Sequence, residues 1–218
     1  MKKVFRLMAI AAITCGLCMN VGCGKDEEDG DGNGGNNTPV VNPENLPTTI
    51  DEHFDNGMPE GWVAIDADGD GYNWVLASQS WFATNGTGNA AFGIDGSDCM
   101  ASASFINGIN ALTTDQYLVL PKLYIPEEGR TLTYQVTNYQ AQYPDQYSVV
   151  VGTLENGTFN VTATLQAPER VNTGIAEETG YTARTISLND YKDQSIYIAF
   201  RHNDSDAYWL FVDDVKVE

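Results

Sequence analysis

The chain has 218 residues, a length that suits one domain with a leader better than two large domains. It carries 30 Asp and Glu against 11 Lys and Arg, which gives a formal net charge of −19. A chain this acidic repels a phosphate backbone, so no nucleic-acid partner is expected. A hydrophobic content of 42% is too high for a wholly disordered chain, so a folded core is expected.

The N-terminus has the features of a secretion signal. A mostly apolar stretch over residues 7–21 follows three basic side chains, Lys2, Lys3 and Arg6. The stretch is too short and wrongly flanked to span a membrane. It ends in Gly22-Cys23, as a bacterial lipobox does, although Asn20 stands where Leu is usual. We predict a signal peptide over 1–22 and lipidation of Cys23, with an ordinary cleaved signal as the alternative.

The segment after Cys23 predicts a surface anchor. Lys25 and the acidic run at 26–29 resemble the surface-export signal of some Gram-negative lipoproteins. Residues 24–47 are rich in Gly, Asn, Asp and Pro, which is typical of a flexible, hydrated stalk. Several acyl chains on one cysteine hold a protein firmly in a bilayer. We therefore predict a protein anchored in a bacterial outer membrane that faces the cell exterior.

Residues 48–218 predict one all-β domain, a two-sheet jelly-roll sandwich. Short strand-like runs alternate with turn residues, and no segment shows a capped helical period. Alternation of polar and apolar residues is clear over 131–136 and 196–200. About a dozen short strands suit two packed sheets. The expected strands are 50–54, 62–65, 72–76, 90–93, 100–105, 116–120, 131–139, 147–152, 159–165, 181–188, 195–202 and 208–217.

The cysteine and histidine content argues against catalysis. Cys99 is the one cysteine of the predicted domain, so no internal disulfide is expected, and we interpret it as a buried apolar residue. The two histidines, His53 and His202, stand in no zinc motif, and no nucleophile elbow occurs. We expect no enzyme and no catalytic residue, with His202 a polar group at a strand edge or in a loop.

The sharpest local motif is Asp66-Ala-Asp68-Gly-Asp70-Gly71. Ca²⁺ takes about six to eight hard oxygen ligands, so alternating short carboxylates on a bend that glycine permits suit it. The motif is not an EF-hand, because the position of the twelfth loop residue, usually a bidentate Glu, is taken by Ala77 and no flanking helices are evident. The motif predicts either a calcium loop in another scaffold or a bare acidic turn of the Asx type.

Two further groups of carboxylates stand at the two ends of the domain. Asp213 and Asp214 lie in the last expected strand, where neighbouring side chains face opposite ways, and Glu52 and Asp55 flank the first. First and last strands of a jelly roll are often neighbours, so these carboxylates are candidates to share one ion. The alternative is exposed charge that serves solubility.

Five motifs in order resemble the cleaved-adhesin family, the jelly-roll adhesin modules of gingipains and haemagglutinins that overlap the group called choice-of-anchor J. The matches run over 52–62, 65–74, 115–123, 143–151 and 198–215. The resemblance implies a non-catalytic β-sandwich that is stabilised by calcium and binds host proteins or glycans. It implies calcium ligands at Asp66, Asp68 and Asp70, at Glu52 or Asp55, and at Asp213 or Asp214.

Aromatic side chains near turn residues are the candidate ligand contacts. The stretch 78–89 carries Trp81 and Phe82, and the Tyr- and Gln-rich stretch 139–147 carries Tyr139 and Tyr143. Trp74 and Trp209 are further candidates for a stacking platform. Three functions stay open: an adhesin for host or matrix protein, a module that captures carbohydrate for a polysaccharide-utilisation system, and an inert spacer or assembly subunit.

Overall fold

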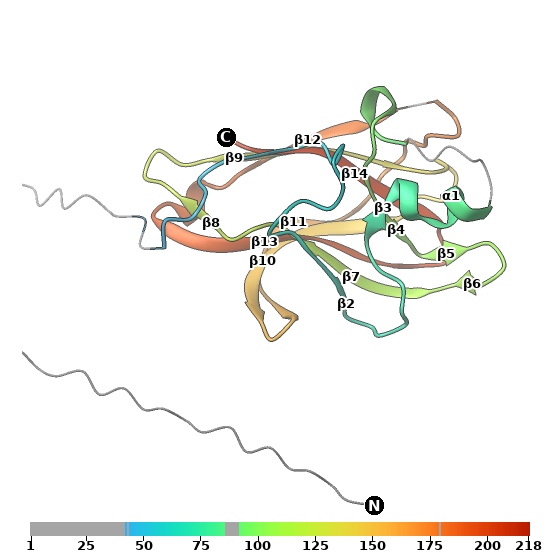
Figure 1. Ribbon diagram of the computed structural model, residues 1–218, viewed down its shortest axis with the longest axis horizontal. Coiled ribbons are helices and arrows are strands. Elements are labelled where there is room, and N and C mark those ends of the chain that lie inside the picture. The colour runs from blue at the N-terminus through green and yellow to red at the C-terminus, as the bar shows by residue number, and fades with distance from the viewer. Residues whose placement is uncertain (1–41, 43, 86–91, 179) are drawn as a thin grey trace, which may run out of the picture. The chain divides into compact units, whose positions relative to one another are not determined.

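The computed structural model describes residues 42, 44–85, 92–178 and 180–218, and almost all of its regular structure is β-strand (Figure 1). The predicted signal peptide, Cys23 and most of the predicted stalk lie outside the described residues. The end of that stalk contacts the domain, because Lys122 pairs with Glu44 at 2.6 Å and the Tyr124 amide donates to the Pro47 carbonyl at 3.0 Å.

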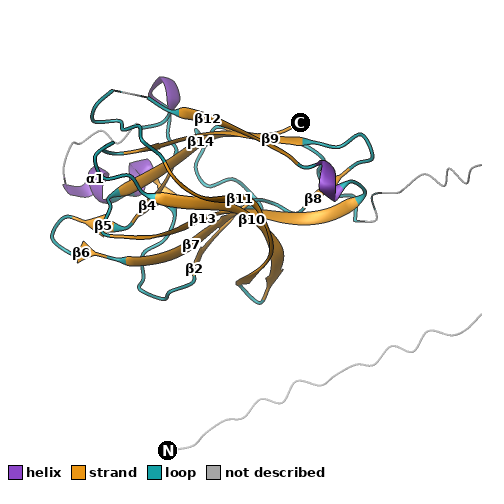
Figure 2. Ribbon diagram, turned by 180° about the vertical axis from the view of Figure 1, so that it is seen from behind, coloured by secondary structure: helices purple, strands orange, loops and turns teal. Residues whose placement is uncertain are grey.

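Two antiparallel sheets of six strands each form the sandwich, as the two layers in Figures 1 and 2 show. The first sheet has the order β12 (Thr182–Ser187), β9 (Thr131–Asn138), β14 (Trp209–Val217), β4 (Met100–Ala103) and β3 (Val75–Leu76), and β1 (Ile50–Glu52) also pairs with β14. The second has the order β11 (Thr158–Arg170), β10 (Gln146–Glu155), β13 (Gln194–Ser205), β7 (Thr113–Val119) and β2 (Val63–Asp66), and β8 (Leu123–Ile125) also pairs with β13. The predicted all-β jelly-roll sandwich is confirmed.

Several short elements differ from the prediction. Of the strand expected at 90–93, residues 90 and 91 lie outside the described residues, and the prediction is wrong for Phe92 and Gly93, which lead into the 3-10 turn Ile94–Gly96. The strand β8 and the hairpin of β5 (Phe105–Ile106) and β6 (Asn110–Ala111) were not expected as such, since runs of two or three residues are too short to show alternation. The helix α1 (Trp81–Asn85) and the 3-10 turns Ala77–Gln79 and Asn189–Tyr191 are likewise too short to show a period. Within the described part of the chain, no helix has the length and apolar character needed to cross a membrane.

The main core lies between the sheets and follows from strand alternation. In β9 the residues Leu132, Tyr134 and Val136 are buried, whereas the residues between them are partly exposed. They pack with Phe200 and other side chains of the facing sheet. Burial of each such side chain stabilises the fold by about 1.5–3 kcal/mol.

A second, aromatic core lies on the other face of β14 and β4, where α1 packs: Trp209 and Phe211 belong to it, whereas Leu210 and Val212 belong to the main core. Phe82 of α1 lies at its centre, with ring centroids 4.4 Å from Tyr139, 5.3 Å from Trp209 and 5.1 Å from Phe92. The end loops therefore rest on packed rings, which hold the surface above them in one shape.

Candidate metal and ligand-binding sites

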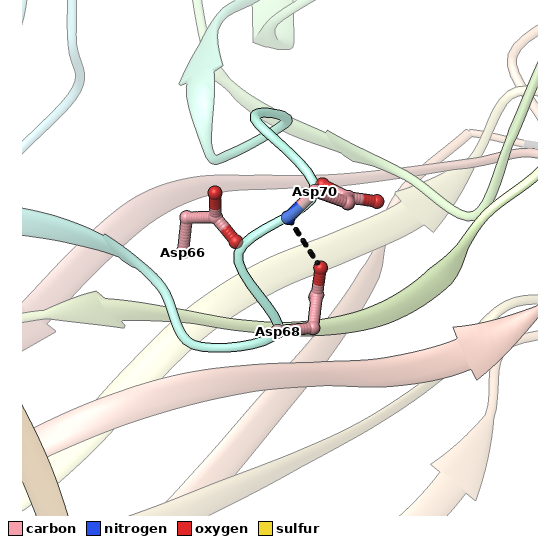
Figure 3. Close-up of side chains that lie close together, drawn as sticks. All are labelled: Asp66, Asp68 and Asp70. Atoms are coloured by element: carbon pink, nitrogen blue, oxygen red, sulfur yellow. Dashed lines mark hydrogen bonds between the residues drawn. The ribbon is translucent and has the colours of Figure 1, made fainter.

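The aspartate motif forms a tight loop after β2 that carries the three carboxylates close together (Figure 3). One ligand oxygen from each of Asp66, Asp68 and Asp70 lies within 4.8 Å of the other two. Asp66 accepts from the Gly69 and Gly71 amides at 2.7 and 2.9 Å, and these glycines have φ of 78° and 88°. Such positive φ angles favour glycine, so the sequence fixes this curl.

The loop is tied to the sheet beside it. The Asp68 carboxylate accepts from the Asp115 amide of β7 at 2.6 Å, and the Ala67 amide donates to the Asp115 carbonyl at 3.0 Å. Asp115 itself pairs with Arg201 at 2.7 Å. The loop is thus held in position by β7, a contact that the sequence motif does not show.

The electrostatics of the loop suit a cation. Partial burial, together with the neighbouring Asp68 and Asp66 charges, raises the pKa of the Asp70 carboxyl. A bound cation would remove this repulsion, and the donors are the hard oxygens that Ca²⁺ prefers. The donor types therefore fit a calcium ion, and the hydrogen bonds that these carboxylates accept from backbone amides equally fit the Asx-type turn that the sequence left open.

The carboxylates from the two ends of the domain form a separate cluster. The first and last strands pair with each other as expected, and Glu52 of β1 lies opposite Val215 of β14. A β-bulge follows Asp213, and Asp214 has φ of 49°, so simple alternation stops there. Asp213 is buried and accepts from the Ile94 amide at 2.8 Å, and burial raises the pKa of its carboxyl to about 6.

This terminal cluster already has cationic partners. His53 contacts Asp214 through Nδ1 and Asp51 through Nε2, and Lys216 pairs with Asp51 at 2.9 Å. Asp55 lines a shallow groove with His53 and Asp214, whereas Glu52 accepts from the His53 and Phe54 amides. Among the residues that the structure describes, three ligand oxygens lie within 4.8 Å of one another in the aspartate loop alone.

The aromatic candidates divide by burial. Phe82 is 2% exposed, so its prediction as an exposed ligand contact is wrong: the ring is the centre of the aromatic core. Trp74 and Trp209 are also buried, so their prediction as parts of an exposed stacking platform is wrong as well. Trp81 and Tyr139 are half-buried, and Tyr143 is 48% exposed. Turn composition alone did not distinguish these cases, because packing beneath the loops decides them.

A fully buried polar network lies between the sheets. His202 of β13 is 0% exposed, which corrects the prediction of a strand-edge or loop group. Its Nδ1 lies 2.7 Å from Ser102 Oγ and its Nε2 lies 3.0 Å from Asp145 Oδ1. Ser102 also donates to Gln116 at 2.6 Å. Because Ser102, His202 and Asp145 are all closed off from solvent, this Ser-His-Asp row is a structural network and not a catalytic triad.

The same network holds the end loops. Asp145 accepts from Ser104 Oγ and from the Tyr208 amide, and its own amide donates to Asn138 at 3.1 Å. Ser104 also accepts from the Ala207 amide at 3.1 Å. The loop before β10 and the turn before β14 therefore share one buried anchor. The sequence analysis singled out the segments 143–151 and 198–215, but nothing in the sequence showed that Asp145 of the first contacts His202 of the second.

Together, the two sheets, the aspartate loop and the aromatic core define a jelly-roll β-sandwich module. The profile of the Cleaved Adhesin Domain family matches residues 47–217. Hemagglutinin A of Porphyromonas gingivalis strain W83 is 34% identical over 197 residues, and Gingipain R1 of the same species is 32% identical over 179 residues. These matches cover 84% and 78% of this chain but only 8% and 10% of those two proteins.

Solved structures agree. The K3 and K1 cleaved adhesin domains of Lys-gingipain from Porphyromonas gingivalis W83 match with TM-scores of 0.63 and 0.62 and identities of 32% and 31%. Each match covers 78% of this chain and 96% or 98% of the solved domain. The chain belongs to the Cleaved Adhesin Domain family, which confirms the resemblance found in the sequence.

Proposed function

We propose that this protein is a lipid-anchored, adhesin-like binding module of a bacterial outer membrane, held in shape by calcium and without catalytic activity. The family match over residues 47–217, to domains whose names describe adhesins, is the observation that carries this proposal. The partner is a host or matrix protein or a glycan, bound through the loops at the α1 end.

Calcium would act on the loop that carries Asp66, Asp68 and Asp70. Bound there, it would neutralise three converging carboxylates and fix the turn between β2 and β3. The carboxylates at the ends of the domain stay a second predicted ligand group, at Glu52, Asp55, Asp213 and Asp214. The binding loops would then keep their geometry outside the cell, where the buried free Cys99 offers no disulfide.

The binding function is tested with residues 42–218. The related K1 domain was solved as a chain of which the match covers 98%, so a domain of this extent folds without its neighbours. The domain is immobilised and exposed to fibrinogen, fibronectin and serum albumin, and separately to a glycan array, in millimolar Ca²⁺ and in excess chelator. We expect saturable binding to one class of partner that weakens in chelator. No binding to either class would favour the spacer or assembly subunit instead.

Replacement of the predicted lipidated cysteine tests the anchor. In the Cys23→Ser variant we expect the protein to move from the membrane fraction to the soluble extracytoplasmic fraction, because the acyl chains supply most of its membrane affinity. Labelling with a fatty-acid analogue, followed by fractionation and protease treatment of intact cells, measures this. Cys99→Ser is the matched control, and unchanged fractionation of the Cys23→Ser protein would contradict the lipid anchor.

A further inference from the structure

A groove of about 530 Å³ lies beside β5. Figure 1 shows β5 and β6 at the same end of the sandwich as α1. Three segments that are distant in sequence line it: the β5–β6 hairpin, the loop after β9 and the turn between β13 and β14. Its principal side chains are Phe105, Asn107, Gln140, Tyr143, Asp206 and Tyr208.

The groove offers aromatic faces that the fold leaves uncovered. Tyr143 is 48% exposed, and Phe105 and Tyr208 are half-buried with ring centroids 6.1 Å apart. A partly exposed tyrosine offers a ligand both the apolar face of its ring and its polar hydroxyl group. This combination suits a molecule whose surface alternates between C–H and hydroxyl groups.

The polar groups of the groove match hydroxyls and carry little charge. Gln140 and Asn107 have side-chain amides, each with donors and an acceptor, and Asp206 adds an acceptor. No described residue is hydrogen-bonded to the Gln140 side-chain amide or to the Asp206 carboxylate. The described lining includes no lysine or arginine, and the chain carries a net charge of −19, which disfavours sulfated or sialylated ligands.

The walls of the groove are preorganised by hydrogen bonds within the protein. The Tyr208 amide and the Ala207 amide are held by Asp145 and Ser104, and Asn107 donates to the Tyr208 hydroxyl at 2.7 Å. On the other wall, the Tyr143 amide donates to the Gln140 carbonyl at 3.1 Å. A site whose walls are already fixed loses little conformational entropy on binding.

From this geometry we infer that the groove is a binding site for a neutral glycan, with Tyr143 as the stacking face and Asn107, Gln140 and Asp206 as partners for sugar hydroxyls. This inference rests on the proposed binding function and names its site and ligand class. A cationic peptide is the competing occupant, since Asp206 lies beside aromatic rings.

The test is a titration of residues 42–218 with neutral gluco-, galacto-, manno- and xylo-oligosaccharides, with a sialylated and a sulfated oligosaccharide, and with an arginine-rich peptide. The Tyr143→Ala variant removes the exposed ring, and Asp206→Asn removes the charge but keeps the acceptor and a residue type that tolerates its φ of 58°. Val161→Ala on β11 is the control, since Val161 is 41% exposed and lies outside the groove.

We expect a neutral oligosaccharide to bind, Tyr143→Ala to weaken it by about thirtyfold, as loss of a hot-spot side chain does, and Asp206→Asn and Val161→Ala to weaken it only slightly. Three results would overturn the inference: no neutral sugar binds, Tyr143→Ala leaves its affinity unchanged, or the peptide binds and Asp206→Asn abolishes that binding. If no neutral sugar binds but one of the test proteins does, the glycan groove is rejected and the proposed function stands. Absence of every ligand would reject both.

Discussion

The Asp145→Ala variant is expected to lose about 3–5 kcal/mol of unfolding free energy, the cost of removing one partner of a buried polar pair. Asp145 is fully buried and serves His202 Nε2, Ser104 Oγ and the Tyr208 amide at once. Its loss leaves three donors without their acceptor, those of His202 and Ser104 fully buried and the Tyr208 amide partly buried, and opens a cavity. For a domain of this size the melting temperature should fall by roughly 6–20 °C.

Thermal and urea unfolding of residues 42–218 measure this effect. The matched control is Asp115→Ala, which removes a carboxylate of the same type from a half-exposed pair with Arg201. That pair is bidentate and partly buried, so the control should lose about 1 kcal/mol, well below the loss expected for Asp145→Ala. Equal losses in the two variants would show that the buried network does not anchor the end loops.

Removal of Ca²⁺ is expected to have the second-largest effect. A ligand at about 100 times its dissociation constant stabilises the folded state by about 2.7 kcal/mol, so excess chelator should lower the melting temperature by roughly 5–10 °C. Mg²⁺ should restore little of this loss, because it requires a small octahedral site and keeps its waters.

The Asp68→Asn/Asp70→Asn double variant separates the ion from the turn. Asparagine at 70 keeps an oxygen to accept from the Tyr72 amide, whereas asparagine at 68 keeps one oxygen for the two amides, of Asp70 and Asp115, that the carboxylate serves. Without calcium the loss of that contact with β7 and the loss of repulsion among the carboxylates oppose each other, so the stability of the variant should stay within about 1 kcal/mol of the parent. With calcium it should show no rise in melting temperature. If this variant still responds to calcium, the aspartate loop is not the calcium site, and the terminal carboxylates become the candidate ligands.

The sequence was sufficient for the sandwich, because alternation and turn residues are local signals. The burial pattern of β9 and the pairing of β1 with β14 both agree with it. The aspartate loop was equally visible, since its carboxylates and glycines lie within six consecutive residues.

What the sequence could not show depends on contacts between distant segments. Phe82 sits among turn residues, yet Tyr139 and Trp209 close over it from other strands. His202 and Asp145 meet across 57 positions of the chain, and their burial follows from the register of β13 beside β7 and β10. The groove at the α1 end is likewise a product of topology, because its three walls come from three separate turns.

The pairing of β1 with β14 also sets how the protein would carry mechanical load. The described chain begins beside β8, where Pro47 meets Tyr124, and α1 lies at the opposite end (Figures 1 and 2). A membrane tether at one end and a captured partner at the other would therefore pull along the strands. Ladder hydrogen bonds lie perpendicular to that pull, so those between Ile50–Glu52 and Val215–Val217 would be strained together in shear rather than opened one at a time. Such a geometry resists detachment under flow.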